Sequence, residues 1–213
     1  MNLLFLYTNH WFKSKMTSLT PTENKVLLRL FKDFSSDYNA NSLSKKIGIT
    51  PRGALKILKS LHKHGLLTAK QMGKATFYKI NLSDYYAFRT IETLLIQESR
   101  ENASRWLSEF QDLFKEVQIA IIFGSIIRQP KQANDIDLLL VFTQKDLKNV
   151  KLTINEKNRI LLKPIHSIMQ SPDDINNNLN KKDPVVLSAL STGYVLHGYD
   201  KLIEVVKNVT SFQ

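Results

Sequence analysis

Two apolar runs in the second half of the sequence limit what the chain can fold into more than any other feature. Residues 119–123 carry no polar side chain and end at Gly124 and Ser125. A second run, 135–142, follows after about ten residues and is apolar apart from two aspartates at its start. Short apolar runs bounded by turn-forming residues are typical of strands buried in a sheet. The sequence therefore predicts two neighbouring buried strands, joined by a turn and a short helix.

The second of these strands begins with two aspartates, Asp135 and Asp137. Because side chains alternate along a strand, both carboxylates face the same side, about 7 Å apart along the chain. Mg²⁺ is commonly held by one or two carboxylates together with phosphate oxygens of a substrate. A glycine permits close backbone approach, and the amides and hydroxyl at a helix start bind phosphate, so Gly124 and Ser125 complete a candidate nucleotide-metal site.

The bulk composition narrows the class of protein. The chain has 213 residues, which suits two small domains, and it has no cysteine. The lack of cysteine excludes disulfides and cysteine metal sites and fits a reducing cytoplasm. The apolar residues 3–7 are too few to span a membrane and have no preceding basic cluster, so we expect a cytoplasmic protein in which they serve packing or dimerisation.

The net charge of +11 is concentrated in the first half of the chain. Residues 1–116 hold 18 Lys and Arg against 10 Asp and Glu, net +8, whereas residues 117–213 hold 12 against 9, net +3. Residues 39–83 include nine basic side chains and no acidic one. A stretch of this length without a carboxylate predicts a polyanionic partner.

The same basic region carries the signals of three short helices and a hairpin. Thr20-Pro21 and Thr50-Pro51 each combine a capping residue with a proline in the first turn, and a tight turn at 72–74 separates two strand-like runs. The expected elements are helices from Thr20, over 42–47 and over 51–64, followed by strands at 66–71 and 75–80. On the third helix the expected buried stripe is Ala54, Leu55, Leu58 and Leu61, and the basic residues Arg52, Lys56, Lys59 and Lys63 lie on another face.

This order of elements resembles the winged helix-turn-helix of bacterial and archaeal transcription regulators, over roughly residues 20–82. The resemblance implies that the third helix enters the major groove of double-stranded DNA. The alternative is a small helical module that docks on a protein and has a solvated basic face. The resemblance places Arg52, Gly53 and Lys56 near base edges and Lys59, Lys63 and Lys74 near phosphates.

Residues 84–116 are expected to form a structured helical connector. Two apolar stripes have helical spacing and are separated by the polar residues 97–102. Regulators of this kind commonly dimerise through helices that flank the winged helix, so the connector and the first twelve residues are both candidates for a homodimer interface. The two stripes are Tyr85, Phe88, Ile91 and Leu95, and Trp106, Phe110, Leu113 and Phe114.

The Gly-Ser turn followed by Asp-x-Asp on the next strand resembles the minimal nucleotidyltransferases of the DNA polymerase beta superfamily, over roughly residues 117–205. The resemblance implies that Mg²⁺ (or Mn²⁺) assists transfer of a nucleoside monophosphate from an NTP to a hydroxyl on a protein, an RNA or a small molecule. The alternative is an unrelated small α/β domain. The implied metal ligands are Asp135 and Asp137, and the implied nucleotide-binding residues are Gly124, Ser125 and Arg128.

Members of that superfamily usually have a third carboxylate on a later strand. It completes the metal site, and it either acts as the base that deprotonates the acceptor hydroxyl or orients that base. The strand expected at 161–169 offers Lys163, His166 and a serine instead, and Asp173 and Asp174 come after it, where they are expected to cap a helix. His166 is the candidate catalytic replacement, and its other interpretation is a strand histidine bonded to a neighbour. Since losing a general base costs about 10²–10⁴ in rate, a slow, a substrate-assisted and an inactive domain all stay open.

The sequence thus predicts an α+β protein with two domains: a winged helix-turn-helix at 1–83, a helical connector at 84–116, and a nucleotidyltransferase-like α/β domain with a small mixed sheet at 117–213. The favoured function is a DNA-binding protein that binds Mg-NTP and transfers the nucleoside monophosphate. The alternative is a transcription regulator whose second domain is inactive and senses a nucleotide or binds a partner. An antitoxin that modifies a partner toxin is a further variant, although such proteins are commonly shorter and lack a winged helix.

Overall fold

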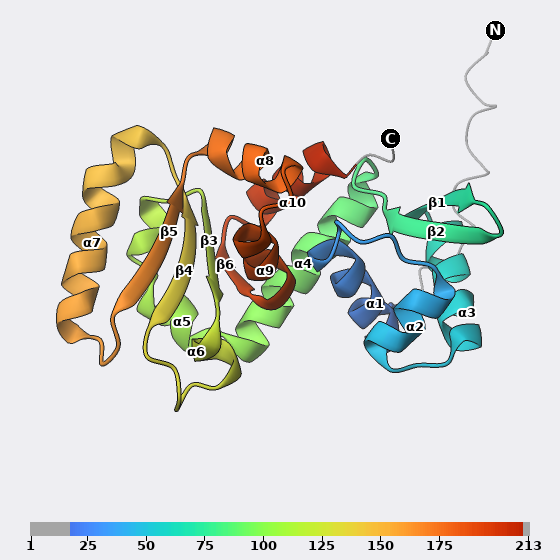
Figure 1. Cartoon of the computed structure of the whole chain (residues 1–213), viewed down its shortest axis with the longest axis horizontal. Helices are drawn as coiled ribbons and strands as arrows, with labels where there is room; N and C mark the ends of the chain where they lie inside the picture. The colour runs from blue at the N-terminus through green and yellow to red at the C-terminus, as the bar shows by residue number, and fades with distance from the viewer. Residues whose placement is uncertain (1–17, 211–213) are drawn as a thin grey trace, which may run out of the picture.

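The computed structural model describes residues 18–210, so the segment at 3–7 and its expected role in packing or dimerisation lie outside the described residues. Helices and strands alternate in an α+β arrangement with two separate sheets, as expected. Figure 1 shows an elongated molecule with the larger sheet in one half and the small hairpin sheet in the other. Among the described residues, no helix is long and apolar enough to cross a membrane.

Residues 18–80 contain the expected three helices and hairpin, which we call the N-terminal unit. The first helix begins at a capping box in which Thr20 and Glu23 bond each other's backbone amides. Gly48 closes the second helix with a φ of 75°, a conformation that glycine adopts without steric cost. The elements are α1 (Pro21–Lys32), α2 (Ala40–Ile47), α3 (Pro51–Lys63), β1 (Leu67–Met72) and β2 (Ala75–Ile80).

The buried stripe of α3 is narrower than its spacing indicated. Ala54, Leu58 and Leu61 are buried, whereas Leu55 is 39% exposed, so its expected burial is wrong. Leu55 lies next to the basic residues and turns away from the core, because Ala54, Leu58 and Leu61 form the face of α3 that packs toward α2 and β1.

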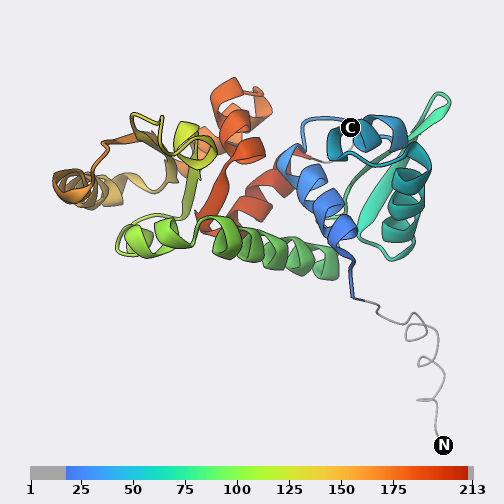
Figure 2. The ribbon, with the colours of Figure 1, turned by 90° about the horizontal axis from the view of Figure 1, so that it is seen from below.

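Residues 84–116, the expected helical connector, form one long helix followed by two short ones. The helix α4 (Tyr85–Asn102) continues through the polar stretch 97–102, and α5 (Ser104–Glu109) and a short 3-10 helix (Leu113–Lys115) follow it. Ile91 and Leu95 are buried as expected, but Tyr85 is 78% exposed, so its place in the buried stripe is wrong. Figure 2 shows α4 running along one side of the molecule, from the N-terminal unit to the larger sheet.

The larger sheet has four strands in the order β5-β4-β3-β6. The pair β4·β5 is parallel, and β3 is antiparallel to both β4 and β6, which makes the sheet mixed. The third expected strand starts later than 161, because Pro164 ends the preceding segment and Leu162 is fully solvent-exposed. The strands are β3 (Ile119–Phe123), β4 (Ile136–Val141), β5 (Ile165–Gln170) and β6 (Tyr194–His197).

Helices cover both faces of this sheet. Side chains of β3 and β4 alternate between two hydrophobic clusters, one shared with α8, α9 and α10 and the other with α5 and α7. The first cluster also includes the cores of α1, α2, α3 and α4, so one continuous core extends from the N-terminal unit to the sheet. The remaining helices are α6 (Ser125–Arg128), α7 (Leu147–Ile160), α8 (Pro172–Asn180), α9 (Pro184–Thr192) and α10 (Tyr199–Val209), with a 3-10 turn at Gln144–Asp146.

Candidate metal and nucleotide site

Strand directions gather the expected site residues at one edge of the sheet. Because β3 and β4 are antiparallel, the end of β3 lies beside the start of β4, and Phe123 pairs with Asp137. Because β4 and β5 are parallel, their starts lie side by side, and Asp137 pairs with His166. The Gly-Ser turn after β3, the two aspartates and the histidine are therefore close in space although they span more than 40 residues of sequence.

Three side chains at this edge have the arrangement of a metal site. Asp135, Asp137 and His166 each offer one ligand atom, and these atoms all lie within 4.8 Å of one another. His166 Nδ1 lies 3.1 Å from Asp137 Oδ1, and the imidazole is 67% exposed, whereas the Asp137 side chain is 18% exposed. Two carboxylates and an imidazole on one side of a sheet can hold a divalent ion and leave coordination positions open to solvent or substrate.

Gly124 is required by the position of Asp137. A Cβ at residue 124 would lie 2.9 Å from Asp137 Cγ and closer still to one carboxylate oxygen. The backbone of Gly124 has φ 81° and ψ −155°, a region that side-chain-bearing residues rarely enter. The missing side chain thus leaves the space that the Asp137 carboxylate occupies.

Ser125 is the first residue of α6, a helix of one turn that ends at Arg128. The Arg128 side chain folds back over this turn, and its Nε donates to the Gly124 carbonyl at 3.2 Å. This contact holds the Gly-Ser turn against the helix that follows. The roles of Ser125 and Arg128 toward a nucleotide remain predictions.

A lysine holds the loop that leads into the two aspartates. Lys163 donates to the carbonyls of Pro130 (2.9 Å) and Ala133. The Ile136 amide donates to the Pro164 carbonyl at 2.9 Å, which joins the same loop to the start of β5. The sequence marks Lys163 only as one of the polar side chains of the expected strand, and no spacing signal indicates its contact with a loop 30 residues away.

Asp173 and Asp174 lie at the start of α8, as expected. Ser171 is the capping residue, its hydroxyl accepts from the Asp174 amide, and the Asp174 carboxylate accepts from the Ser171 amide and hydroxyl. These hydrogen bonds with Ser171 lower the pKa of Asp174. Neither aspartate belongs to the metal-ligand group found among the described residues.

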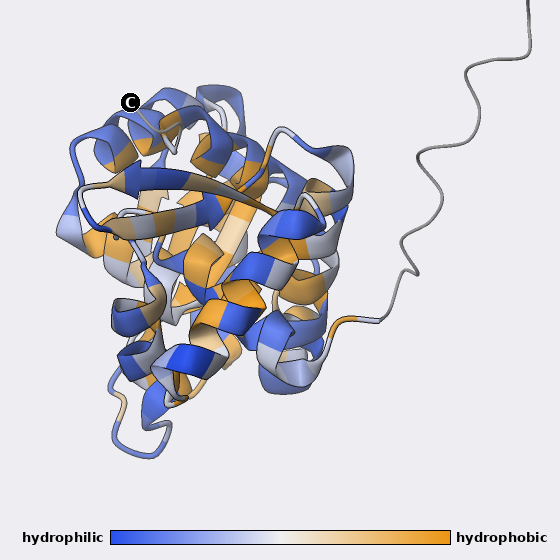
Figure 3. Ribbon diagram, turned by 90° about the vertical axis from the view of Figure 1, so that its right-hand side faces the viewer, coloured by the Kyte–Doolittle hydropathy of each residue, from blue (hydrophilic) through white to orange (hydrophobic). Residues whose placement is uncertain are grey.

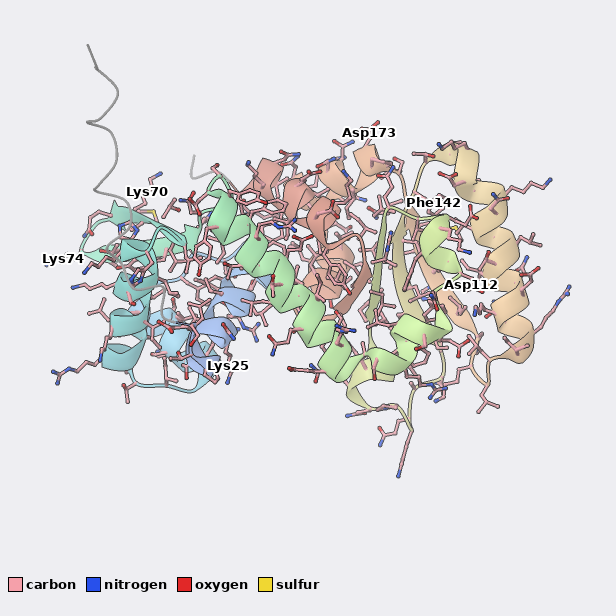
Figure 4. All side chains as sticks on the ribbon, turned by 180° about the vertical axis from the view of Figure 1, so that it is seen from behind. Lys25, Lys70, Lys74, Asp112, Phe142 and Asp173 are labelled. Carbon is pink, nitrogen blue, oxygen red and sulfur yellow. The ribbon has the colours of Figure 1, made fainter. Side chains whose placement is uncertain are left out.

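The expected DNA-binding residues lie on α3 and the hairpin. The side chains of Arg52, Lys56, Lys59 and Lys63 are exposed along α3, and Lys74 is exposed at the hairpin turn, whereas Gly53 is partly covered. Thr50 caps α3 and accepts from the Gly53 amide at 3.1 Å. Figure 3 views the molecule from this end and shows hydrophilic residues interspersed with hydrophobic ones on its helices, and Figure 4 shows Lys70 and Lys74 at the same end.

Comparison with known proteins adds little to this description. No protein-family model matches the chain, and no curated protein matches it. Among solved structures, the chain is similar to the adhesin competence repressor AdcR of Streptococcus pyogenes, at 15% identity and a TM-score of 0.33, over 65% of this chain and 79% of that one. It is also similar to a cysteine-to-serine mutant of Lactococcus lactis ZitR, at 15% identity and a TM-score of 0.31, over 70% and 80% of the two chains. At these TM-scores neither likeness supports a conclusion.

Proposed function

We propose that the chain is a DNA-binding protein whose C-terminal half is a minimal nucleotidyltransferase. In this proposal the sheet edge binds a metal-NTP complex. A hydroxyl on a protein, an RNA or a small molecule attacks the α-phosphorus, the bond to the β-phosphate breaks, and pyrophosphate leaves. One observation carries it: Gly124, Asp135 and Asp137 meet at a single edge of a mixed sheet, in the chain order of the DNA polymerase beta superfamily.

Each residue of the site has a chemical task in this proposal. Asp135 and Asp137 hold the ion, and a bound Mg²⁺ or Mn²⁺ would neutralise charge on the phosphate oxygens. Gly124 leaves room for Asp137 and lets the backbone come close to a phosphate. The Ser125 hydroxyl and the exposed Arg128 guanidinium donate hydrogen bonds to phosphate oxygens.

The acceptor hydroxyl must lose a proton during the transfer. The His166 imidazole lies beside Asp137 at this edge, and it is exposed to an acceptor from solvent. An imidazole can accept such a proton near neutral pH. His166 therefore has two candidate tasks, proton acceptor and metal ligand.

The N-terminal unit would bring the enzyme to duplex DNA. This role is supported by the exposed basic face of α3 and by Lys74 on the neighbouring hairpin. Both lie in a stretch of sequence without acidic residues. Basic side chains spaced along a helix that follows a helix-turn suit phosphate and base-edge contacts in a major groove.

A second function is favoured by one feature of the site. β5 presents His166 opposite Asp137, where a carboxylate usually completes a nucleotidyltransferase site. The alternative is a transcription regulator in which the same sheet edge binds a nucleotide as effector without turning it over. The continuous core between the N-terminal unit and the sheet supports such a coupling, because packed elements transmit strain.

One experiment separates the two functions. Purified protein is incubated with α-labelled NTPs and Mg²⁺ or Mn²⁺, beside the Asp137→Asn variant. Transferred label is sought on the protein, on RNA and on lysate proteins, and equilibrium binding of the same NTPs is measured in parallel. The enzyme predicts label that the variant fails to transfer. Nucleotide binding without label supports the effector function, and neither binding nor label contradicts both.

A further inference from the structure

His166 lies beside Asp137 on the neighbouring strand, close enough for the two side chains to bind one ion together. The two residues are register partners on parallel strands, and neighbouring side chains of this kind point to the same face. His166 Nδ1 lies 3.1 Å from Asp137 Oδ1. The Asp137 carboxylate and the His166 imidazole thus each place one possible ligand atom at the same point of the sheet.

The position of Asp135 favours a shared ion over a simple contact between His166 and Asp137. It is not the register partner of His166, and it lies before the first residue of β4. Its ligand atom nevertheless lies within 4.8 Å of those of both Asp137 and His166. A histidine that only accepts a proton needs one carboxylate to orient it, whereas three groups converging on one point have the arrangement of a ligand set.

We propose that His166 is a metal ligand and that the site consequently prefers Co²⁺ or Zn²⁺ to Mg²⁺, with Mn²⁺ between them. This deepens the proposed function and rests only on its metal site. Mg²⁺ prefers oxygen ligands and loses its waters reluctantly, whereas an imidazole nitrogen suits the later first-row ions. Replacing the third carboxylate of such a site by imidazole changes its choice of ion.

The surroundings of the three side chains are compatible with this assignment. Gly124 leaves the space that the Asp137 carboxylate occupies, and Lys163 holds the loop before Asp135 through two carbonyls. The 67% exposure of the imidazole leaves water or phosphate oxygens access to the remaining coordination positions. Three protein ligands with open positions is the arrangement of catalytic rather than structural zinc-type sites.

The test compares metal affinities, not activity. Binding of Mg²⁺, Mn²⁺, Co²⁺ and Zn²⁺ to the full chain is measured by calorimetry, and the absorption spectrum of bound Co²⁺ is recorded. The His166→Asp variant restores a site of three carboxylates. Since loss of even an outer-shell partner costs about 10–100-fold in metal affinity, the ratio of Co²⁺ to Mg²⁺ affinity should fall by about tenfold or more in the variant.

Two further variants keep the outcome clear. His64→Asp makes the same chemical change at an exposed histidine after α3 and should leave the ratio unchanged. His166→Ala should weaken Co²⁺ binding far more than Mg²⁺ binding and should change the Co²⁺ spectrum. Thermal unfolding checks that each variant is folded, which the exposure of both histidines favours.

The results separate this inference from the proposed function. A preference for Co²⁺ that depends on His166, in a protein that transfers no label, supports the inference and contradicts the enzyme. An equal ratio in wild type and His166→Asp overturns the inference and leaves the enzyme intact. Absence of binding by all four ions at millimolar concentration overturns both the inference and the metal site of the proposed function.

Discussion

At Gly124 both the backbone conformation and the nearby Asp137 carboxylate exclude a side chain. The φ of 81° and the contact with Asp137 both require its absence. We predict that Gly124→Ala displaces the Asp137 carboxylate, weakens metal binding and lowers the free energy of unfolding by about 1–3 kcal/mol. Calorimetric metal titration and urea denaturation measure the two effects.

Gly65→Ala is the control for this substitution. Gly65 has a φ of 79°, but no atom of residues 18–210 lies within 4 Å of the Cβ that alanine would add. The control should lose about 1 kcal/mol from the unfavourable φ and keep wild-type metal binding. Equal loss of metal binding in the two variants would contradict the contact between Gly124 and Asp137.

The partly buried His197 should make the stability of the fold depend on pH. Burial lowers its pKa below the ordinary value of 6.5, and the charge of Asp200 raises it in part. The ring stacks on Phe114 at a centroid distance of 5.2 Å. Because the folded state disfavours the protonated ring, the unfolded state binds more protons below about pH 6.5, and stability is lost as pH falls through that region.

We therefore predict that the free energy of unfolding of the wild type falls between about pH 7 and pH 5.5, and that His197→Phe falls less. Phenylalanine keeps an aromatic ring beside Phe114 but has no proton to gain. Urea denaturation at several pH values measures both slopes. Identical slopes would show that His197 does not titrate differently in the two states.

At the scale of elements, α3 carries the clearest test of DNA binding. We predict that Arg52→Ala with Lys56→Ala weakens binding to duplex DNA by about tenfold or more, since two charge-assisted contacts are lost, and leaves nucleotide binding unchanged. Gel shift and fluorescence anisotropy measure the affinity. The wild-type affinity should also fall steeply with rising salt, as phosphate contacts require.

The control for α3 removes the same charge elsewhere. Lys148→Ala with Lys151→Ala takes two exposed cations from α7, in the opposite half of the molecule (Figure 1). This control should keep most of the DNA affinity. If both double variants lose affinity equally, binding follows net charge and not the α3 face.

Element signals that are local in the sequence were predicted well. The capping residues and prolines at Thr20 and Thr50 mark the starts of α1 and α3, because the hydrogen bonds that begin a helix involve neighbours within three residues. Exposure of Leu55 and Tyr85 could not be read from helical spacing, since it depends on which partners cover each face. The convergence of His166 on Asp137 depends on the parallel pairing of β4 and β5, which is a long-range contact.

At the scale of the whole molecule, the N-terminal unit and the sheet are joined through α4. Lys32 on α1 bonds Glu98 on α4 at 2.9 Å and the Gly193 carbonyl at 2.7 Å, and the two charged side chains are only 10% and 17% exposed. Ser99 on α4 donates to the Val195 carbonyl of β6. These contacts and the continuous core beneath them connect parts of the chain that the sequence analysis assigns to different domains. The domain boundaries themselves stay predictions.

We predict that Lys32→Met lowers the free energy of unfolding by about 1–3 kcal/mol, because it leaves Glu98 and a carbonyl without a partner in a largely buried place. The control Lys201→Met removes an exposed pair with Glu204 and should cost at most about 0.5 kcal/mol. Urea denaturation followed by circular dichroism measures both. A similar cost for the two variants would contradict a structural role for the Lys32 contacts.

Nucleotide binding at the edge of the sheet should depend on a metal ion held by Asp135 and Asp137. Equilibrium binding of an NTP to the wild type and to Asp137→Asn, with Mn²⁺ and with a chelator, measures this dependence. We expect the wild type to bind the nucleotide only when the ion is present, and we expect the variant not to bind it. Equal binding with the chelator, or equal binding by the variant, would contradict this dependence.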